Sequence, residues 1–260
     1  MRNRVEEKFS NFYEKWMSQL ENFVGLLLMV SSEQSSEEEA CEAVYHKLMA
    51  HHREYYTSKW AAVNENVLPF FSSVWLSPLE KTYTWVTGWR PLVAFQLIET
   101  LRSKSNTEEV ASLASLTEEQ LKKIEDLEAI ISADEKRLEK EMVRHDMQMA
   151  SWKMLELVRL ESAAKRQGDA DVLRQVNEMV EAARKGMVGG KRRAVKMADV
   201  LRRRTLKGVL DVLTPIQRVD FLATTSMLQV QMGKWGKQRA AAQMRKWEKQ
   251  RADKKRGYLM

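Results

Sequence analysis

The sequence contains few residues of the kinds that stop helices or cross-link a chain. Its 260 residues include one cysteine, four prolines and ten glycines. The single cysteine, Cys41, cannot form an internal disulfide, which fits a reducing compartment. Leucine, alanine, glutamate, lysine, arginine and methionine are plentiful, and all of them favour helices. The composition therefore predicts long helices and leaves few turns for a sheet.

Long hydrophobic runs are also missing. The longest apolar run, Val24 to Val30, is too short to cross a bilayer. The first residues carry positive charge, but no uninterrupted apolar core follows them, so no signal peptide is expected. We therefore expect a soluble intracellular protein, and 260 residues suffice for one large domain or two small ones.

Apolar residues recur at three- and four-residue steps in several segments, which is the pattern of amphipathic helices. The pattern predicts helices over residues 3–30, about 43–66, 117–168, 169–185, 191–213 and from 215 onward. A kink or loop is expected within 140–170, and Gly186, Gly189 and Gly190 predict a flexible hairpin. No strand-length alternating stretch stands out, so the predicted fold is all-α, a multi-helix bundle with long antiparallel helices.

The stretch from residue 72 to residue 101 is predicted to be the centre of a packed domain. Ser77, Pro78 and Glu80 mark a helix start, because a serine cap, a proline at the first helical position and a capping-box glutamate coincide. Gly88 is expected to end that helix and Pro91 to begin the next one. The motif comprises Trp75, Ser77, Pro78, Glu80, Trp85, Gly88, Trp89, Arg90 and Pro91.

Two further start signals occur later in the chain. Thr214, Pro215 and Gln217 repeat the combination of cap, proline and box, and they open a final helix that is predicted to run through Trp235. A capping box over residues 117–120 is predicted to begin the long middle helix.

Positive charge is concentrated late in the chain. Residues 184–208 carry ten lysines and arginines against one aspartate, and residues 233–260 carry ten against two acidic residues, although the whole chain has a net charge of only +7. Such runs attract nucleic acid, anionic lipid or an acidic partner, or serve nuclear import, but more often they form a solvated helix face. The predicted basic patch comprises Lys191, Arg192, Arg193, Lys196, Arg202, Arg203, Arg204, Arg245, Lys246, Lys254, Lys255 and Arg256.

Candidate catalytic and metal-binding residues are few. His46, His51 and His52 lie on one predicted helix, but they lack the three- or four-residue spacing that helical metal ligands usually have. His145 falls on the apolar row of the middle helix, where an interior or interface role is expected. Cys41 follows three glutamates, which would raise the pKa of its thiol. We therefore expect no catalytic residue, no metal site and no cofactor.

The stretch WLSPLEKTYTWVTGWRP resembles the tryptophan-centred motif of the plant DOG (Delay of Germination) domain, which is shared with the C-terminal half of TGA-type bZIP transcription factors. FSNFYEKWMSQL resembles the opening helix of that family, and the segments beginning LTEEQLKKIE and MADVLRRRTL resemble its middle and closing helices. The resemblance predicts a DOG domain over residues 5–239 and a basic tail over 240–260. It favours the stand-alone branch, with its seed-dormancy and Inaperturate Pollen-like proteins, because the domain here begins near residue 5.

The resemblance implies a non-enzymatic protein that binds other proteins in developmental, signalling or transcriptional control. Stand-alone members bind signalling proteins such as type 2C phosphatases, and some bind haem through histidines on the last helix. No histidine lies between Thr214 and Met260, so haem ligation there is not expected. The implied location is the nucleus or the cytoplasm, with peripheral association with the plasma membrane and homo-oligomerisation left open.

Two function classes remain open at this point. The family resemblance favours a scaffold that regulates transcription or signalling through protein partners. The basic end of the chain favours direct binding of nucleic acid or of an anionic membrane, with Trp235 and Trp247 placed to stack on bases or to enter the interface. Salt separates the two, because added salt weakens phosphate binding steeply and hardly affects docking on an apolar surface.

Overall fold

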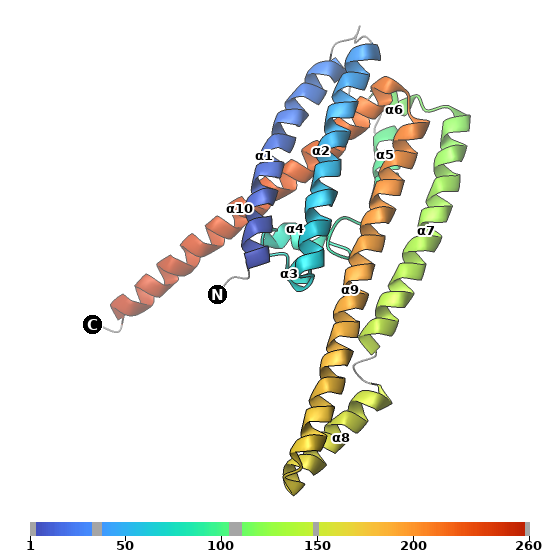
Figure 1. The fold of residues 1–260 in the computed structure, drawn as a ribbon. Coiled ribbons are helices and arrows are strands. Elements are labelled where there is room, and N and C mark those ends of the chain that lie inside the picture. Colours follow the sequence, from blue (N-terminus) through green and yellow to red (C-terminus); the bar gives the residue numbers. More distant parts are fainter. Residues whose placement is uncertain (1–3, 33–37, 104–110, 148–150, 258–260) are drawn as a thin grey trace.

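The computed structural model describes residues 4–32, 38–103, 111–147 and 151–257 (Figure 1). Across these residues the chain is helical apart from its connecting loops, and the strand-like structure is limited to a bridge between Trp85 and Gly88. The all-α prediction is therefore confirmed. In chain order the helices are α1 (Arg4–Ser32), α2 (Glu38–Glu65), α3 (Leu68–Ser72), α4 (Pro78–Thr82), α5 (Val93–Ser103), α6 (Ala111–Ala114), α7 (Glu118–Met147), α8 (Trp152–Gln167), α9 (Ala170–Val212) and α10 (Pro215–Gly257).

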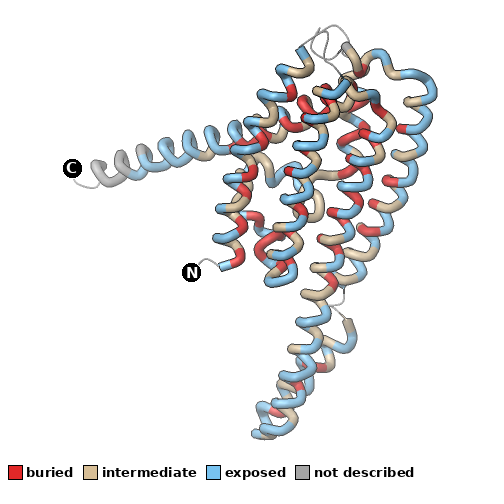
Figure 2. Tube along the Cα trace, turned by 45° about the horizontal axis from the view of Figure 1, so that its top comes forward, coloured by how far each residue is buried: buried red, intermediate tan, exposed pale blue. Residues whose placement is uncertain are grey.

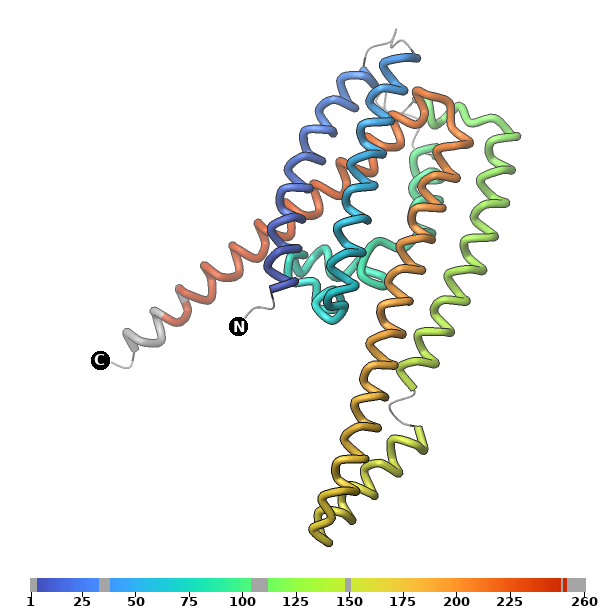
Figure 3. The backbone as a smooth tube through the Cα atoms, viewed as in Figure 1, coloured from blue at the N-terminus to red at the C-terminus, as the bar shows by residue number. Residues whose placement is uncertain are grey.

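The body of the molecule has two halves. Helices α1 and α2 form one half as an antiparallel hairpin, and α7 and α9 pair to form the other (Figures 1 and 3). Helix α2 also contacts α9, and α10 crosses both α1 and α2, so that the last helix holds the first two in place. The short helices α3 to α6 occupy the space between these long elements (Figure 1).

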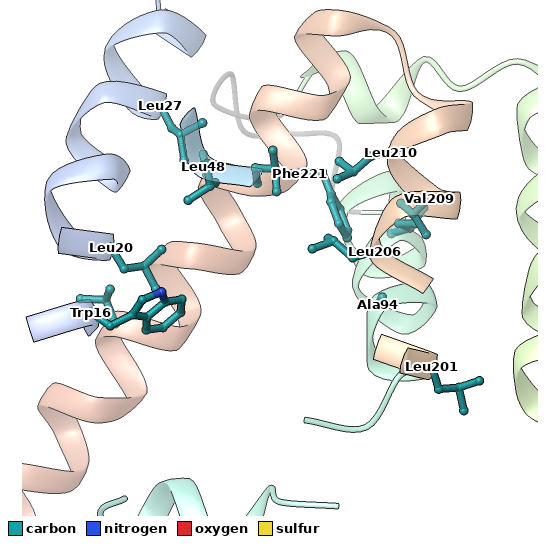
Figure 4. Packing of buried hydrophobic residues seen from close by; sticks show 14 of the residues in the cluster. Trp16, Leu20, Leu27, Leu48, Ala94, Leu201, Leu206, Val209, Leu210 and Phe221 are labelled. Atoms are coloured by element: carbon teal, nitrogen blue, oxygen red, sulfur yellow. The ribbon is translucent and has the colours of Figure 1, made fainter. Parts of the chain in front are cut away.

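The core lies where the two halves meet. Helix α1 faces it with the apolar stripe that the sequence predicts, and Phe9, Trp16, Leu20 and Leu27 are buried. Burying one such side chain completely stabilises the fold by roughly 1.5–3 kcal/mol. Figure 4 shows how α1, α2, α5, α9 and α10 contribute to one cluster, with Trp16, Leu20, Leu27, Leu48, Ala94, Leu201, Leu206, Val209, Leu210 and Phe221 labelled.

The predicted middle helix is divided into two helices. Helix α7 ends at Met147, and α8 begins after Ser151, whose hydroxyl accepts a hydrogen bond from the amide of Met154. The predicted interruption within 140–170 is thus confirmed. Because the break ends the apolar row, Trp152 is 66 % exposed instead of continuing the buried face of Ile131 and Leu138.

The predicted glycine hairpin is wrong. Helix α9 runs without interruption from Ala170 to Val212, so the separate helices expected over residues 169–185 and 191–213 are one element. Gly190 is buried there, and a Cβ atom at this position would lie 2.8 Å from Nδ1 of His145. The glycine is needed because it lets α7 and α9 approach closely, and the packing of α7 and α8 along α9 outweighs the low helix propensity of glycine.

Two segments extend away from the body (Figure 2). The distal arm, residues 152–185, consists of α8 and the first part of α9 side by side. The C-terminal tail, residues 237–257, continues α10 as a helix whose described side chains are exposed apart from the half-buried Ala240. None of the helices in the described ranges is both long and apolar enough to cross a membrane.

Candidate interaction site at the tryptophan loop

The tryptophan loop, residues 73–92, begins with the helix cap that the sequence predicts. The backbone amide of Ser77 donates to Oε2 of Glu80 at 2.8 Å, and the amide of Glu80 donates to the Ser77 hydroxyl at 3.3 Å, which completes the capping box. The hydroxyl of Tyr13 donates to the other carboxylate oxygen of Glu80. Burial and this carboxylate raise the pKa of Tyr13, so the hydroxyl keeps its proton and ties α1 to the loop.

Helix α10 passes close to this cap. Gly233 and Gly236 are both buried, and a Cβ atom at Gly236 would collide with the Ser77 side chain. The two glycines, one turn apart, form the face of α10 against which α4 packs. Trp235 lies between them on α10, which runs through it as predicted, and its side chain is 46 % exposed.

The second half of the loop differs from its prediction. Helix α4 ends at Thr82, before Gly88, and α5 begins at Val93, after Pro91. Between them Trp85 and Gly88 exchange backbone hydrogen bonds across a tight turn. This non-helical path persists because its carbonyl groups find partners elsewhere in the protein.

Arg202 of α9 supplies those partners. Its guanidinium group donates to the carbonyl oxygen of Trp89 at 2.6 Å, to that of Val86 at 2.9 Å, and to that of Trp85. The side chain of Arg202 is only 1 % exposed, so its assignment to the solvent-facing basic patch is wrong. An arginine has several fixed donors and can therefore satisfy several buried carbonyl groups at once.

The charge of Arg202 belongs to a buried cluster. Asp199 accepts from Arg202 at 2.6 Å, from Nζ of Lys59 at 2.8 Å and from Nε1 of Trp60 at 3.1 Å. Nζ of Lys59 also donates to the carbonyl oxygen of Thr87. Burial lowers the pKa of Lys59 to about 8, and the carboxylate of Asp199 opposes that shift. We call the three charged residues, Lys59, Asp199 and Arg202, the buried charge cluster.

A second ionic contact fixes the end of the loop to α7. Arg90 donates to Glu135 at 2.7 Å and to Glu139 at 3.0 Å. Glu135 is fully buried and also accepts from the amide of Leu92 at 2.9 Å, which gives a partner to an amide at the start of α5 that has none within the helix. Trp85 donates through Nε1 to Glu139, and the guanidinium groups of Arg90 and Arg202 lie over its ring, 5.9 and 5.6 Å from the centroid.

The remaining tryptophans of the motif have different surroundings. The ring of Trp75 packs edge-on against Phe9 and Phe70, with centroid distances of 4.8 and 5.1 Å. Trp89 is half-buried and packs against the main core. The loop thus contacts α1, α2, α7, α9 and α10, which supports the predicted central position of the motif.

At the start of α10, one of the two hydrogen bonds of the predicted capping box forms. The amide of Thr214 donates to Oε1 of Gln217 at 3.0 Å, and Pro215 occupies the first helical position. The same oxygen accepts from the side-chain amide of Gln120, so this terminus is linked to the start of α7. At that start, the predicted box between Thr117 and Gln120 forms in both directions.

The other predicted basic-patch residues do not form one surface. In the body, Lys191 approaches Asp146 at 3.6 Å, Arg203 lies over the ring of Trp60, and Arg204 pairs with Asp134 at 3.0 Å. Of the rest, Arg192 and Lys196 are half-buried and Arg193 is exposed on α9, whereas Arg245 and Lys246 are exposed on the C-terminal tail. The side chains of Lys254, Lys255 and Arg256 lie outside the described residues.

The histidines are held by packing contacts. The ring of His51 stacks on Trp16 at 4.7 Å and bonds through Nε2 to the Trp16 carbonyl oxygen, while Trp16 donates through Nε1 to the His51 carbonyl oxygen. Burial lowers the pKa of His51, and it lowers the pKa of the adjacent His52 to about 4. His46 is exposed beside Glu42, and His145 lies against Gly190.

Cys41 is also buried, and burial raises the pKa of its thiol. Among the residues that the structure describes, no three histidine, cysteine, aspartate or glutamate side chains form a group that could hold a metal ion.

Sequence inspection missed the buried charge cluster, although one signal was present. Arg202 follows Val195 and precedes Val209 by seven residues each, and both valines are buried. A residue at that spacing on a helix shares their face and is expected to point inward. Lys59 and Asp199 gave no comparable signal, because their pairing depends on how α2 and α9 are placed.

The sequence of this chain is similar to those of several known proteins. A family model described as seed dormancy control (DOG1) matches residues 24–100. Protein DOG1-like 4 of Arabidopsis thaliana is 44 % identical over 239 residues, which cover 92 % of this chain and 96 % of that protein. Protein RESPONSE TO ABA AND SALT 1 of the same plant is 26 % identical over 240 residues, 90 % of this chain and 97 % of the relative. A TGACG-sequence-specific DNA-binding protein of Nicotiana tabacum, TGA-2.1, is 25 % identical over 80 % of this chain but only 42 % of its own length.

Proposed function

Because this chain belongs to the DOG1-like family of seed dormancy control proteins, we propose that it is a non-enzymatic regulatory protein that acts by binding other proteins. The observation that carries the proposal is the apolar outer face of the distal arm. Trp152, Leu155 and Val158 are 66 %, 52 % and 56 % exposed there. Clusters of large exposed apolar side chains mark interaction surfaces more often than isolated ones do.

In the distal arm, α8 and α9 pack against each other along a narrow apolar seam. Leu157 and Ala164 of α8 and Val176 of α9 are buried between the two helices. Trp152, Leu155 and Val158 follow one another at three-residue steps and lie away from this seam, so a partner can cover them without displacing α9. An amphipathic helix or an apolar groove on another protein has the chemistry to do so.

A paired purification tests the role of the arm. We expect wild-type protein, expressed in plant tissue and purified by affinity, to retain regulatory proteins that the double variant Leu155→Asp with Val158→Asp loses. The matched control is the double variant Met197→Asp with Val200→Asp, which places the same two charges on side chains of α9 in the body that are 45 % and 53 % exposed. If the arm variant retains the same proteins as wild type and control, the arm is not the binding surface.

The process that we propose is control of seed dormancy or of a related developmental programme, with the nucleus as a site of action. Of the two processes associated with the stand-alone branch, seed dormancy and pollen development, the description of the family model supports seed dormancy. The similarity to TGA-2.1 supports a link to transcription, but it covers 42 % of that protein and by itself assigns no DNA binding to this chain. The proposed domain spans residues 5–239, and a basic segment over residues 240–260 follows it. The C-terminal tail as defined above starts three residues earlier, where the side chains of α10 become exposed.

A second candidate function rests on the C-terminal tail. We propose that this tail adds electrostatic binding of phosphate groups, in nucleic acid or on an anionic membrane. Within the described part of the chain, Arg245 and Lys246 take part in no ion pair, and the guanidinium group of Arg251 lies 5.6 Å from the ring centroid of Trp247. Trp247 is 60 % exposed, so an aromatic ring and several cations reach solvent together.

Salt titration separates this function from the first. We expect wild-type protein to bind duplex DNA or phosphatidylserine vesicles with an affinity that falls steeply as salt rises, and a chain lacking residues 237–260 to lose that binding. Vesicles of phosphatidylcholine alone serve as the neutral control for the lipid arm. Undiminished binding by the truncated chain would assign the interaction to another surface.

A further inference from the structure

The face of α10 that packs against the body continues beyond it. Gly233 and Gly236 are buried against α4 and its cap, and Ala240, one turn later, is half-buried. Steps of three and four residues keep a position on one side of a helix, so Met244 and Trp247 follow Ala240 on the same face. Both of these side chains are 60 % exposed, because the helix has left the body by then. We call Ala240, Met244 and Trp247 the tail stripe.

The tail contains the whole net charge of the protein. Residues 237–257 include nine lysines and arginines and two acidic residues, a net charge of +7, and the net charge of the complete chain is also +7. The residues outside the tail therefore sum to zero. A second copy of the chain offers a body without net charge and another basic tail, so it lacks the complementary charge. The partner that fits the tail is acidic.

The shape of the tail stripe favours a deformable protein groove. Its two large side chains bury little area in a bilayer, so attachment to a membrane depends on the charge of the tail. Two helices that pack together lie roughly 8–10 Å apart, which leaves little room for the indole ring of Trp247 at the centre of the contact. A groove lined by methionine side chains adapts to such a ring, because methionine is unbranched and polarizable.

The tail is also open to a partner that surrounds it. It projects away from the body (Figure 2), and at about 1.5 Å per residue its helix extends about 30 Å. The side chains of residues 241–248, 250 and 251 are exposed, and together they occupy every face of the helix. A groove can therefore close around the tail without displacing any helix of the body.

We propose that the C-terminal tail is a docking helix for an acidic calcium-sensor protein of the EF-hand type. Calcium opens such proteins and exposes grooves rich in methionine, and basic amphipathic helices are the ligands that these grooves take. Met244 and Trp247 are the apolar anchors, and the surrounding lysines and arginines face the acidic rim of the groove. The docking goes beyond the phosphate binding proposed above, because it requires the two anchors as well as the charge. It makes the protein responsive to calcium.

Calorimetric titration of the full chain with calmodulin tests the proposal. In the presence of calcium we expect one calmodulin to bind per chain, with a dissociation constant of about 1 μM or lower. When the calcium is chelated, calmodulin stays acidic but its grooves close, so the binding should weaken by at least about a hundredfold. Equal binding with and without calcium, or no saturable binding at about 50 μM calmodulin, overturns the proposal.

Two double variants locate the site. Met244→Gln with Trp247→Gln removes both anchors and keeps every charge of the tail. It should weaken calcium-dependent binding by at least about thirtyfold, because a few large buried side chains dominate the affinity of such interfaces. The control, Met147→Gln with Trp152→Gln, replaces the same residue types outside the tail, at positions that are 68 % and 66 % exposed, and should bind as wild type does. Undiminished binding by the tail variant, or equal losses in the two variants, would place the contact elsewhere and overturn the assignment.

Phosphatidylserine vesicles separate the tail stripe from the charge around it. Since the tail variant keeps all its lysines and arginines, its affinity for these vesicles should stay within about threefold of the wild-type value. A loss of vesicle binding as large as the loss of calmodulin binding would show that Met244 and Trp247 enter a membrane. That result would overturn their role as anchors in a protein groove.

Discussion

Lys59 and Asp199 lie 140 residues apart in the sequence and form an ion pair, with 2.8 Å between Nζ and Oδ1, in which both side chains are almost completely buried. Arg202 shares the same carboxylate and carries the connection on to the backbone of the tryptophan loop. A helix of the first half, a helix of the second half and the loop between them thus meet at one aspartate. Losing that aspartate leaves two buried cations without an anion.

We expect Asp199→Asn to lower the free energy of unfolding by about 3–5 kcal/mol, because breaking a buried ion pair leaves uncompensated charge in the interior. The matched control is Asp134→Asn, which removes the partner of Arg204 on the surface and should cost under about 1 kcal/mol. Urea denaturation of both variants measures the difference. Equal losses would mean that water reaches the buried charge cluster.

The histidine pair on α2 predicts that stability falls in mild acid. The folded protein holds His52 neutral down to about pH 4, because burial lowers its pKa, whereas the unfolded chain takes up that proton near pH 6.5, the ordinary pKa of histidine. The unfolded state therefore binds more protons between these two values, and stability falls as pH decreases from 6.5 to about 4. His51 shifts in the same direction.

The slope is at most about 1.4 kcal/mol per pH unit for each histidine. Denaturation of wild type and His52→Gln at about pH 7 and about pH 5 should show a smaller loss for the variant, because the variant has one proton fewer to take up. His46→Gln, at an exposed position of the same helix, serves as the control. Parallel pH dependence in all three proteins would contradict a His52 that stays neutral in the folded protein.

Replacing a glycine with alanine should have opposite effects on stability at two positions, because Gly236 packs against the α4 cap and Gly186 lies in open space. Gly236→Ala should destabilise the protein by about 1–3 kcal/mol, because its Cβ collides with the Ser77 side chain. Gly186→Ala should stabilise α9 by about 0.5–1 kcal/mol, since nothing lies within 4 Å of the added Cβ. Thermal melts of the two variants should therefore shift in opposite directions. A neutral Gly236→Ala would show that α10 moves away easily.

Replacing a tryptophan with alanine should destabilise the protein much more at a packed position than at an exposed one. Trp85→Ala should cost about 3–5 kcal/mol, because the ring packs against two guanidinium groups and its Nε1 is hydrogen-bonded to Glu139. Trp247→Ala removes the same group from an exposed site and should change stability by less than about 0.5 kcal/mol. Melting curves that match for Trp85→Ala and wild type would assign Trp85 to a binding surface instead.

Removal of the C-terminal tail tests whether it belongs to the fold. A chain ending at Gly236 should melt within a few degrees of wild type, because residues 237–251 bury almost no apolar surface against the body. Circular dichroism would register the lost helical turns without a change in cooperativity. A collapse of the fold on truncation would show that these residues are part of the core.

Features that depend on neighbouring residues were readable from the sequence. The capping box of Ser77 and Glu80, the one of Thr117 and Gln120, and the apolar stripe of α1 all form as predicted. Caps and stripes are set by spacings of three and four residues, which a helix converts directly into contacts. Family membership was likewise readable, because a motif is a local pattern.

Contacts between distant segments could not be read in the same way. Arg202 looked like part of a solvated basic run until the turn of Trp85 and Gly88 placed three carbonyl groups beside it. Gly190 looked like a hinge, yet it is the point where α9 accommodates the ring of His145. In both cases, burial by a partner far away in the sequence outweighs the local preference of the residue.

The sequence by itself determined the helical class, the helix starts and the apolar faces, because each depends on residues within one or two turns. The tertiary structure decided which charges are buried and that α9 continues through its glycines. Those outcomes depend on where long helices cross, and a shift of one turn would bring different residues to the crossing. Local propensities are small compared with the burial of a charged or aromatic side chain, so packing determined the final positions.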